Sequence, residues 1–103
     1  MKSLILFFSI LSFTSFSVPL VAQTDCSVLK PGIDSVYFGK CKKGLAHGKG
    51  NAIGVDSYIG RFANGLPDGQ GTYTWANGDT YSGSWMAGKQ HGEGVFVLKL
   101  EDL

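Results

Sequence analysis

The sequence predicts an all-β protein: tandem antiparallel β-hairpin repeats that form one elongated, curved, single-layer sheet. Three observations predict this fold. All fifteen glycines lie beyond residue 31, where they recur at regular spacing together with aromatic residues. Asn-Gly pairs, which tolerate the positive φ of tight turns, separate short segments of alternating polarity that are rich in β-prone residues. No segment of the chain after residue 22 has a helical period.

Residues 1–22 are expected to be a signal peptide outside the fold. A positive start, Met1-Lys2, precedes an uncharged apolar run and a small-residue exit at Ala22, after which we expect cleavage. An uncleaved membrane anchor is the alternative, because a membrane span needs about 20 apolar residues. Several Ser and Thr residues and Pro19 interrupt the run, which favours the signal peptide. We therefore expect export to a periplasmic, cell-envelope or extracellular location.

The charge balance of the remaining chain argues against a nucleic-acid partner. Removing the signal also removes Lys2, so that eight Lys and Arg residues face eight Asp and Glu residues, a formal net charge of zero. Nucleic-acid-binding domains usually carry a basic surplus on one face.

Residues 23–36 are expected to be a leader that caps the start of the array. Cys26 and Cys41 are the two cysteines, and an even count in an exported chain predicts one disulfide. Closing a loop of about 15 residues stabilises a fold by roughly 3 kcal/mol in the chain-entropy model. Two free thiols are the alternative interpretation.

An internal repeat that starts at Tyr37, Tyr58 and Tyr81 is the strongest signal in the chain. Equivalent positions advance by 21 residues and then by 23, and the difference falls after Gly50, where the first unit has a shorter return. We expect three units, at residues 37–57, 58–80 and 81–100. The repeat-defining positions are Tyr37, Gly39, Gly44, Gly48, Gly50, Tyr58, Gly60, Phe62, Gly65, Gly69, Gly71, Tyr81, Gly83, Trp85, Gly88, Gly92 and Gly94.

One unit can be interpreted as a hairpin. Tyr58, Gly60 and Phe62 share one parity and therefore one face of a strand. Gly60 between two rings is expected to leave a groove in which a neighbouring aromatic ring lies flat. Asn64-Gly65 predicts the tight turn of the hairpin, and Asn77-Gly78 predicts the turn into the next unit.

The repeat resembles the MORN (membrane occupation and recognition nexus) family, in the pattern Tyr-x-Gly-x-aromatic, Gly, His/Asp-Gly-x-Gly from Tyr37 to about Leu98. The resemblance implies a slightly curved single sheet of hairpins. The export signal, the Gly/aromatic repeat and the Ala22-Gln23 exit together suggest a small exported protein of bacterial type. The resemblance does not name a function, since MORN arrays are attached to lipid kinases, methyltransferases, junctional proteins and many bacterial proteins. Cys41 departs from the pattern, because later units have Phe62 and Trp85 there. We interpret the first unit as a specialised cap, tied by disulfide to the leader.

The residues predict no enzyme, no cofactor and no metal site. His47, Asp68 and His91 occupy one slot of the repeat, so we expect each to hydrogen-bond to the backbone of its own turn. A metal shared by all three is not expected, because adjacent hairpins would separate them by about two strand spacings of about 4.8 Å each. No nucleophile elbow is present, and the Gly-x-Gly segments lack the following helix of a phosphate loop.

Two binding hypotheses remain. The first is a protein-interaction or self-assembly module, whose candidate surface is Tyr73, Trp75, Tyr81 and Trp85. The alternative is that these rings are the core of a thin sheet. A last strand is expected at residues 95–100, apolar on both faces, where either a second copy pairs or a longer version of the protein continues.

The second hypothesis is peripheral binding to membrane lipid through a basic cluster of the first unit. About 1 kcal/mol per basic residue near an anionic surface would give weak attachment. A solvated charged face is the alternative, and export would place the chain away from phosphoinositides. The candidate residues are Lys40, Lys42, Lys43 and Lys49.

Overall fold

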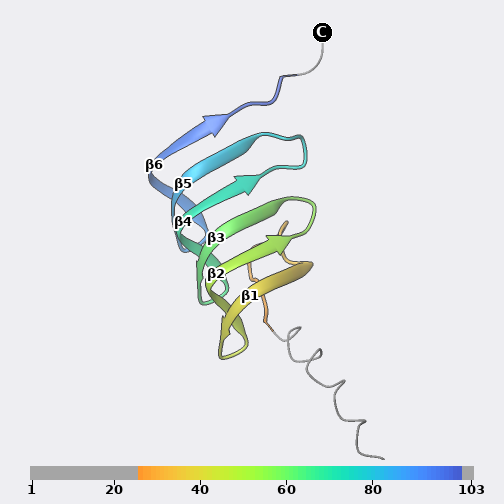
Figure 1. The fold of residues 1–103 in the computed structure, drawn as a ribbon, viewed down its shortest axis with the longest axis vertical. Coiled ribbons are helices and arrows are strands. Elements are labelled where there is room, and N and C mark those ends of the chain that lie inside the picture. The colour runs from red at the N-terminus through yellow and green to blue at the C-terminus, as the bar shows by residue number, and fades with distance from the viewer. Residues whose placement is uncertain (1–25, 101–103) are drawn as a thin grey trace, which may run out of the picture.

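A computed structural model describes residues 26–100, which form one open antiparallel sheet of six strands in chain order (Figure 1). The strands are β1 (Val36–Lys42), β2 (Leu45–Ile53), β3 (Ser57–Ala63), β4 (Leu66–Thr74), β5 (Thr80–Met86) and β6 (Lys89–Val97). Successive pairs make three hairpins that follow one another along the long axis of the view. The expected all-β, single-sheet fold is confirmed. The expected signal peptide at residues 1–22 lies outside the described residues.

The three hairpins turn in the same way. Their central residues are Lys43-Gly44, Asn64-Gly65 and Ala87-Gly88, and all six have positive φ. Two consecutive positive φ values define a type I′ turn, whose twist matches that of the flanking strands. The expected turn at Asn64-Gly65 is confirmed, and the first and third hairpins adopt the same geometry without asparagine.

The links between hairpins account for the change in repeat length. The β2–β3 link has three residues, 54–56, whereas the β4–β5 link has five, 75–79. The expected Asn77-Gly78 turn lies in the longer link, where Gly78 N–H donates to Trp75 O at 2.8 Å and Trp75 N–H donates to Asp79 O at 2.9 Å. The two-residue difference expected after Gly50 therefore lies in these links.

Each hairpin holds a tyrosine ring against a glycine of its own return strand. A Cβ on Gly71 would overlap the Tyr58 ring, and a Cβ on Gly60 would overlap the Gly71 backbone. The ring thus lies on Gly71, and not in a groove at Gly60 as we expected, while Gly60 allows the two strands to approach closely. The Tyr58 hydroxyl donates to Arg61 O at 2.9 Å, at the β-bulge of the hairpin. Burial raises the pKa of Tyr58 to about 12.

The core is a row of aromatic rings that passes from hairpin to hairpin. Tyr37 meets Phe62 of the next hairpin edge to face, with centroids 5.2 Å apart, and Tyr58 meets Trp85 in the same way at 5.4 Å. The tyrosine of one unit therefore packs against the Phe62 or Trp85 position of the next unit. The first hairpin has no tyrosine before it, which explains why Cys41 can stand at that position.

The leader crosses the first two hairpins. Ser27 N–H donates to Gly44 O and Leu29 N–H donates to Gly65 O, both at 2.8 Å, so the leader ties the two turns together. Ile33 is 0 % exposed in the core. Ser27 forms a parallel bridge with Leu45 of β2, so the leader adds no strand outside β1.

The leader is also joined to the sheet through its cysteine. Cys26 and Cys41 are paired, with their Cα atoms 5.7 Å apart, a separation that a disulfide normally spans. Cys41 lies on β1, so the pair connects the first described residue of the leader to the first hairpin. Within residues 26–100, no helix is long and apolar enough to cross a membrane.

Candidate functional site

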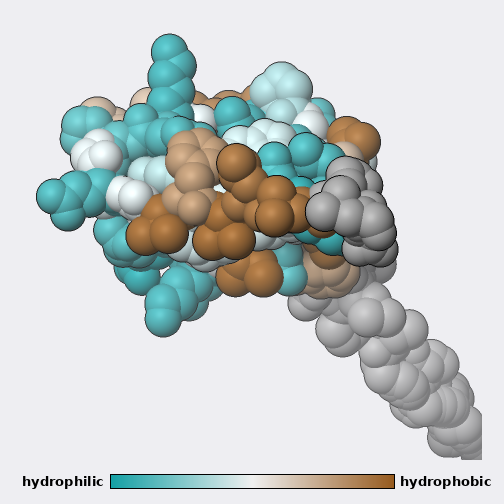
Figure 2. All heavy atoms as spheres, turned by 90° about the horizontal axis from the view of Figure 1, so that it is seen from above, coloured by the Kyte–Doolittle hydropathy of each residue, from teal (hydrophilic) through white to brown (hydrophobic). Residues whose placement is uncertain are grey.

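The outer strand β6 is the most exposed apolar segment of the sheet. Val95, Phe96, Val97 and Leu98 are 62, 54, 57 and 64 % exposed. Figure 2 looks onto this end of the molecule and shows apolar residues gathered in one band beside polar ones. The expected last strand at residues 95–100 was partly wrong, because the strand starts at Lys89 and ends at Val97.

Phe96 is exposed because of its place in the array. Its repeat equivalents, Ala52 and Tyr73, are buried, since the next hairpin pairs with their strands at Tyr58 and Tyr81. Within residues 26–100 no strand pairs with the outer side of β6. The Phe96 ring therefore occupies a repeat position that the following hairpin covers in the two earlier units.

The His/Asp slot connects neighbouring hairpins. Asn64 N–H donates to His47 Nδ1 at 3.3 Å, and Ala87 N–H donates to Asp68 Oδ2 at 3.1 Å. The expectation that each side chain bonds to its own turn was wrong, because both accept from the turn of the following hairpin. His91 holds the same slot in the third hairpin, at the edge of the described sheet.

This arrangement also bears on metal binding. His47 and Asp68 bond to two different turns, so the side chains of this repeat position do not come together at one site. In the part of the chain that the structure describes, no three His, Cys, Asp or Glu residues lie close enough to hold a metal ion.

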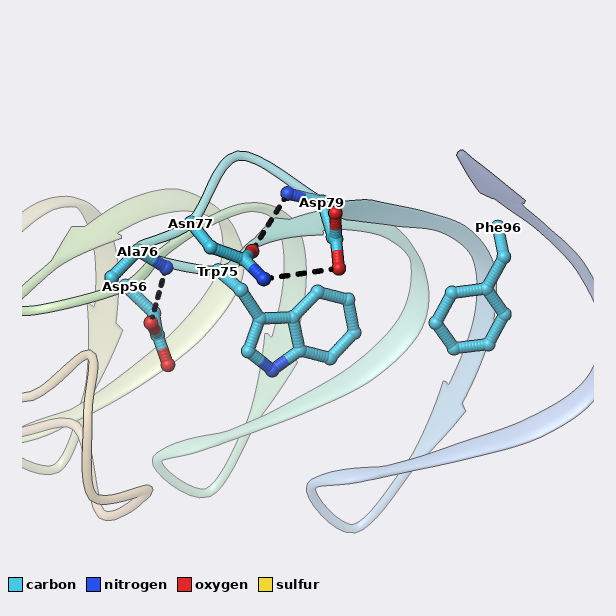
Figure 3. A pocket seen from close by; sticks show the side chains of 6 residues that line it. All are labelled: Asp56, Trp75, Ala76, Asn77, Asp79 and Phe96. Atoms are coloured by element: carbon cyan, nitrogen blue, oxygen red, sulfur yellow. Dashed lines mark hydrogen bonds between the residues drawn. The ribbon is translucent and has the colours of Figure 1, made fainter. Parts of the chain in front are cut away.

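An open cleft of about 400 Å³ lies beside β6 (Figure 3). Its residues come from the β2–β3 link, the β4–β5 link and β6, and they are Asp56, Trp75, Ala76, Asn77, Asp79 and Phe96. The ring planes of Trp75 and Phe96 are 15° apart, with centroids at 5.8 Å. Figure 3 shows the two rings side by side, with Asp56 and Asp79 at the margins of Trp75. The cleft thus has an aromatic floor and an acidic rim.

Backbone and side-chain donors hold both carboxylates in place. Asp56 Oδ1 accepts from Ala76 N–H at 2.9 Å, and Asp56 Oδ2 accepts from the Tyr73 hydroxyl at 2.5 Å. Asp79 Oδ1 accepts from Lys99 N–H at 2.8 Å, and Asp79 Oδ2 accepts from Asn77 Nδ2 at 3.2 Å. Burial, and after it the Asp56 carboxylate, raises the pKa of Tyr73 well above its ordinary value.

The four aromatic residues of the predicted interaction surface differ in their surroundings. Tyr73, Tyr81 and Trp85 are only 4, 4 and 5 % exposed, and all three belong to the core row. Trp75 is partly buried and lines the cleft. Of these four rings, Trp75 is the one that lines the cleft beside β6, together with Phe96, which was not among the predicted interaction residues. Tyr73, Trp75 and Trp85 also border a second cavity, which Lys30 and Lys89 line.

The four lysines of the predicted lipid site are all exposed, but they do not form one group. The pairing of Gly39 with Gly50 places Lys40 beside Lys49 on the sheet face opposite the aromatic rings. Lys49 pairs in turn with Arg61 of β3, which the sequence analysis missed because Arg61 belongs to the next unit. Lys42 and Lys43 lie at the hairpin end instead, at the last residue of β1 and in the turn.

Comparisons with known proteins agree with this architecture. The family model of the MORN repeat matches residues 58–80 and 81–99. The chain is also 40 % identical over 70 residues to alsin of Homo sapiens, Mus musculus and Rattus norvegicus, a match that covers 61 % of this chain and 4 % of alsin. MORN repeats are non-catalytic modules that generally mediate protein or membrane-lipid interactions. Residues 58–99 of this chain therefore contain two MORN repeats.

Proposed function

We propose that this chain is an exported, non-enzymatic β-repeat module that binds protein through the open end of its sheet, as an interaction or cell-envelope scaffolding element. The observation that carries the proposal is the end of β6 and the residue after it, where four consecutive apolar side chains, Val95 to Leu98, are more than half exposed. Unpaired edge strands recruit other strands through their free backbone groups, and apolar side chains add affinity. A second copy of the chain and a different protein both fit this description.

The repeat itself supports strand addition as the mode of binding. Each earlier return strand is covered by the strand that follows it, with Gly69 opposite Trp85 and Gly71 opposite Gly83. β6 carries the equivalent glycines at Gly92 and Gly94 and the same alternation of faces. A partner strand on β6 would therefore meet a template that the chain already uses twice within itself.

Photo-crosslinking in the native cell tests the proposal. A benzoylphenylalanine in place of Phe96 is expected to yield a discrete protein adduct, or an adduct with a second copy of the chain. The matched control is the same residue in place of Ile59, which is similarly exposed but lies on β3, on the sheet face opposite the aromatic rings. Absence of a protein adduct from position 96, or the same adducts from both positions, would contradict the proposal.

Export rests on the first 22 residues, whose basic start, apolar run and small-residue exit are typical of a secretory signal. A Cys26–Cys41 disulfide also suits an oxidising compartment. Cell fractionation followed by N-terminal sequencing tests this part of the proposal, and we expect a mature chain that starts at Gln23. An uncleaved chain found in the reducing cytoplasm would contradict it.

A second candidate function, peripheral binding to anionic lipid, is favoured by one specific observation. Lys40, Lys49 and Arg61 lie side by side on neighbouring strands, next to the exposed side chains of Phe38 and Ile59. Basic and apolar groups on one face suit an anionic membrane surface. Flotation with phosphatidylglycerol vesicles tests it, with Lys49→Ala/Arg61→Ala against Lys89→Ala/Lys99→Ala as the charge-matched control. Equal flotation of both variants would remove this candidate.

A further inference from the structure

We infer that the cleft between Trp75 and Phe96 is a subsite for a cationic side chain, an arginine foremost, of a protein bound at the open end. The inference rests on the proposed protein-binding function and names the chemistry of one contact. It goes beyond the repeat pattern, because the cleft uses link residues that lie between the repeat-defining positions.

The floor of the cleft suits a flat, charged group. The nearly parallel rings of Trp75 and Phe96 turn their faces the same way (Figure 3). The face of an aromatic ring carries negative electrostatic potential and attracts ammonium and guanidinium groups, most strongly when the ring is an indole. A guanidinium is planar and weakly hydrated, so it can lie flat on such a floor.

The rim adds negative charge in the right place. The carboxylates of Asp56 and Asp79 both line the cleft, and each of their oxygen atoms accepts one hydrogen bond from within the protein. A carboxylate oxygen has two lone pairs, so each keeps acceptor capacity for a ligand. These internal bonds also fix the carboxylates, which reduces the entropy lost when a cation binds.

No basic side chain lines the cleft among the described residues. The nearest candidate, Lys99, extends its aliphatic stem over Gly78 and gives its backbone N–H to Asp79. The second cleft that involves Trp75 is different, because it is lined by Lys30 and Lys89. Charge complementarity therefore assigns a cation to the acidic cleft and excludes it from the neighbouring one.

The leader indicates how a partner segment would sit there. At the shorter β2–β3 link, Gly32 O accepts from Asp56 N–H at 3.0 Å, and the backbone of Gly32 and Ile33 packs directly on Gly54. The leader thus fills the space beside the first link. Among residues 26–100, Lys99 contacts the longer β4–β5 link at Gly78 and Asp79, and the cleft beside Trp75 lies open.

Titration of the full chain with two peptides tests the inference. The probes are acetyl-Gly-Ser-Arg-Ser-Gly-amide and the same peptide with citrulline, which replaces the guanidinium by a neutral group of the same shape. The readout is the Trp75 indole N–H resonance. Trp85 serves as the internal reference, because it is buried and its indole N–H donates to Gly71 O. We expect millimolar affinity for the arginine peptide and roughly five-fold weaker binding of the citrulline peptide.

Variants locate the binding. Asp79→Asn is expected to weaken binding of the arginine peptide by about three- to five-fold, since one charge is lost at a partly exposed site. Glu93→Gln is the matched control, because it removes one carboxylate from β6 outside the cleft and is expected to leave affinity unchanged. If circular dichroism shows that Asp79→Asn unfolds the chain, Phe96→Leu replaces it and is expected to weaken binding to a similar extent.

The outcomes separate this inference from the proposed function. Equal binding of the arginine and citrulline peptides, or no Trp75 shift with the arginine peptide, would overturn the cation subsite. Undiminished protein crosslinking from position 96 in the Asp79→Asn variant would also overturn it and leave the proposed function standing. Charge-dependent peptide binding without any protein adduct from position 96 would support the subsite and contradict the proposed function.

Discussion

The two ends of this sheet are built from the same hairpin but are completed in different ways. The first two hairpins carry the leader, which bonds to the turn carbonyls of Gly44 and Gly65 and buries Ile33 in the core. The third hairpin ends in β6, whose apolar side chains are more than half exposed. Register, bulge and tyrosine–glycine contact are nevertheless repeated in all three hairpins.

This difference teaches that the repeat provides the scaffold and that the segments between and around the repeats determine where binding occurs. Tyr58 and Gly71 have structural roles that their equivalents share in every hairpin. Asp56 and Trp75, in contrast, belong to links of unequal length, and they line the cleft together with Phe96. A MORN-type pattern alone therefore cannot indicate the site.

The largest effect is expected from the leader. Ile33→Ala removes a fully buried side chain and should lower the free energy of unfolding by about 2–5 kcal/mol. Leu98→Ala, at the open end, should change it by less than about 0.5 kcal/mol. Urea unfolding followed by tryptophan fluorescence measures both. Similar losses of stability at the two positions would contradict the comparison. If Ile33→Ala does not fold, Ile33→Val replaces it and should lower the free energy of unfolding by about 1 kcal/mol.

The disulfide should contribute an effect of intermediate size. Replacing both Cys26 and Cys41 by serine should lower the free energy of unfolding by about 3 kcal/mol, because the unfolded chain regains the freedom of a closed loop of about 15 residues. The same urea titration checks this, and the reduced wild-type protein is the control. Unchanged stability in the double variant would mean that the two thiols are free in solution.

The smallest effect concerns the slot that joins one hairpin to the next. Asp68→Ala removes the acceptor for Ala87 N–H and should cost about 1 kcal/mol. His91→Ala changes the equivalent position on the edge strand and should cost less than about 0.5 kcal/mol. Thermal unfolding of the two variants measures the difference. Equal destabilisation would show that His91 already has a partner.

Much of the fold followed from local chemistry. Glycine spacing and tyrosine parity predicted three hairpins, the Asn64-Gly65 pair predicted the turn of the second one, and Asn77-Gly78 predicted a turn in the β4–β5 link. These features depend on neighbouring residues and on side-chain alternation along a strand, both of which can be read directly from a sequence.

The site depended on contacts between distant residues. His47 reaches a turn 17 residues away, and Phe96 meets Trp75 only because β6 returns past β5. Lys40, Lys42, Lys43 and Lys49 are close together in the chain, but strand register separates Lys42 and Lys43 from Lys49 and places Arg61 beside it. Strand register and link path decide such contacts, and a single repeat pattern does not encode them.

Residue-resolved native-state hydrogen exchange on the full chain tests the central claim most directly. The claim is that the leader closes the first two hairpins and leaves the third open for a partner. We expect the amides of Leu29 and Gly65 to exchange only through global unfolding, and the β6 amides to exchange through local opening at a clearly lower free energy. Uniform protection from β2 to β6, or a leader that exchanges before β6 does, would contradict the account.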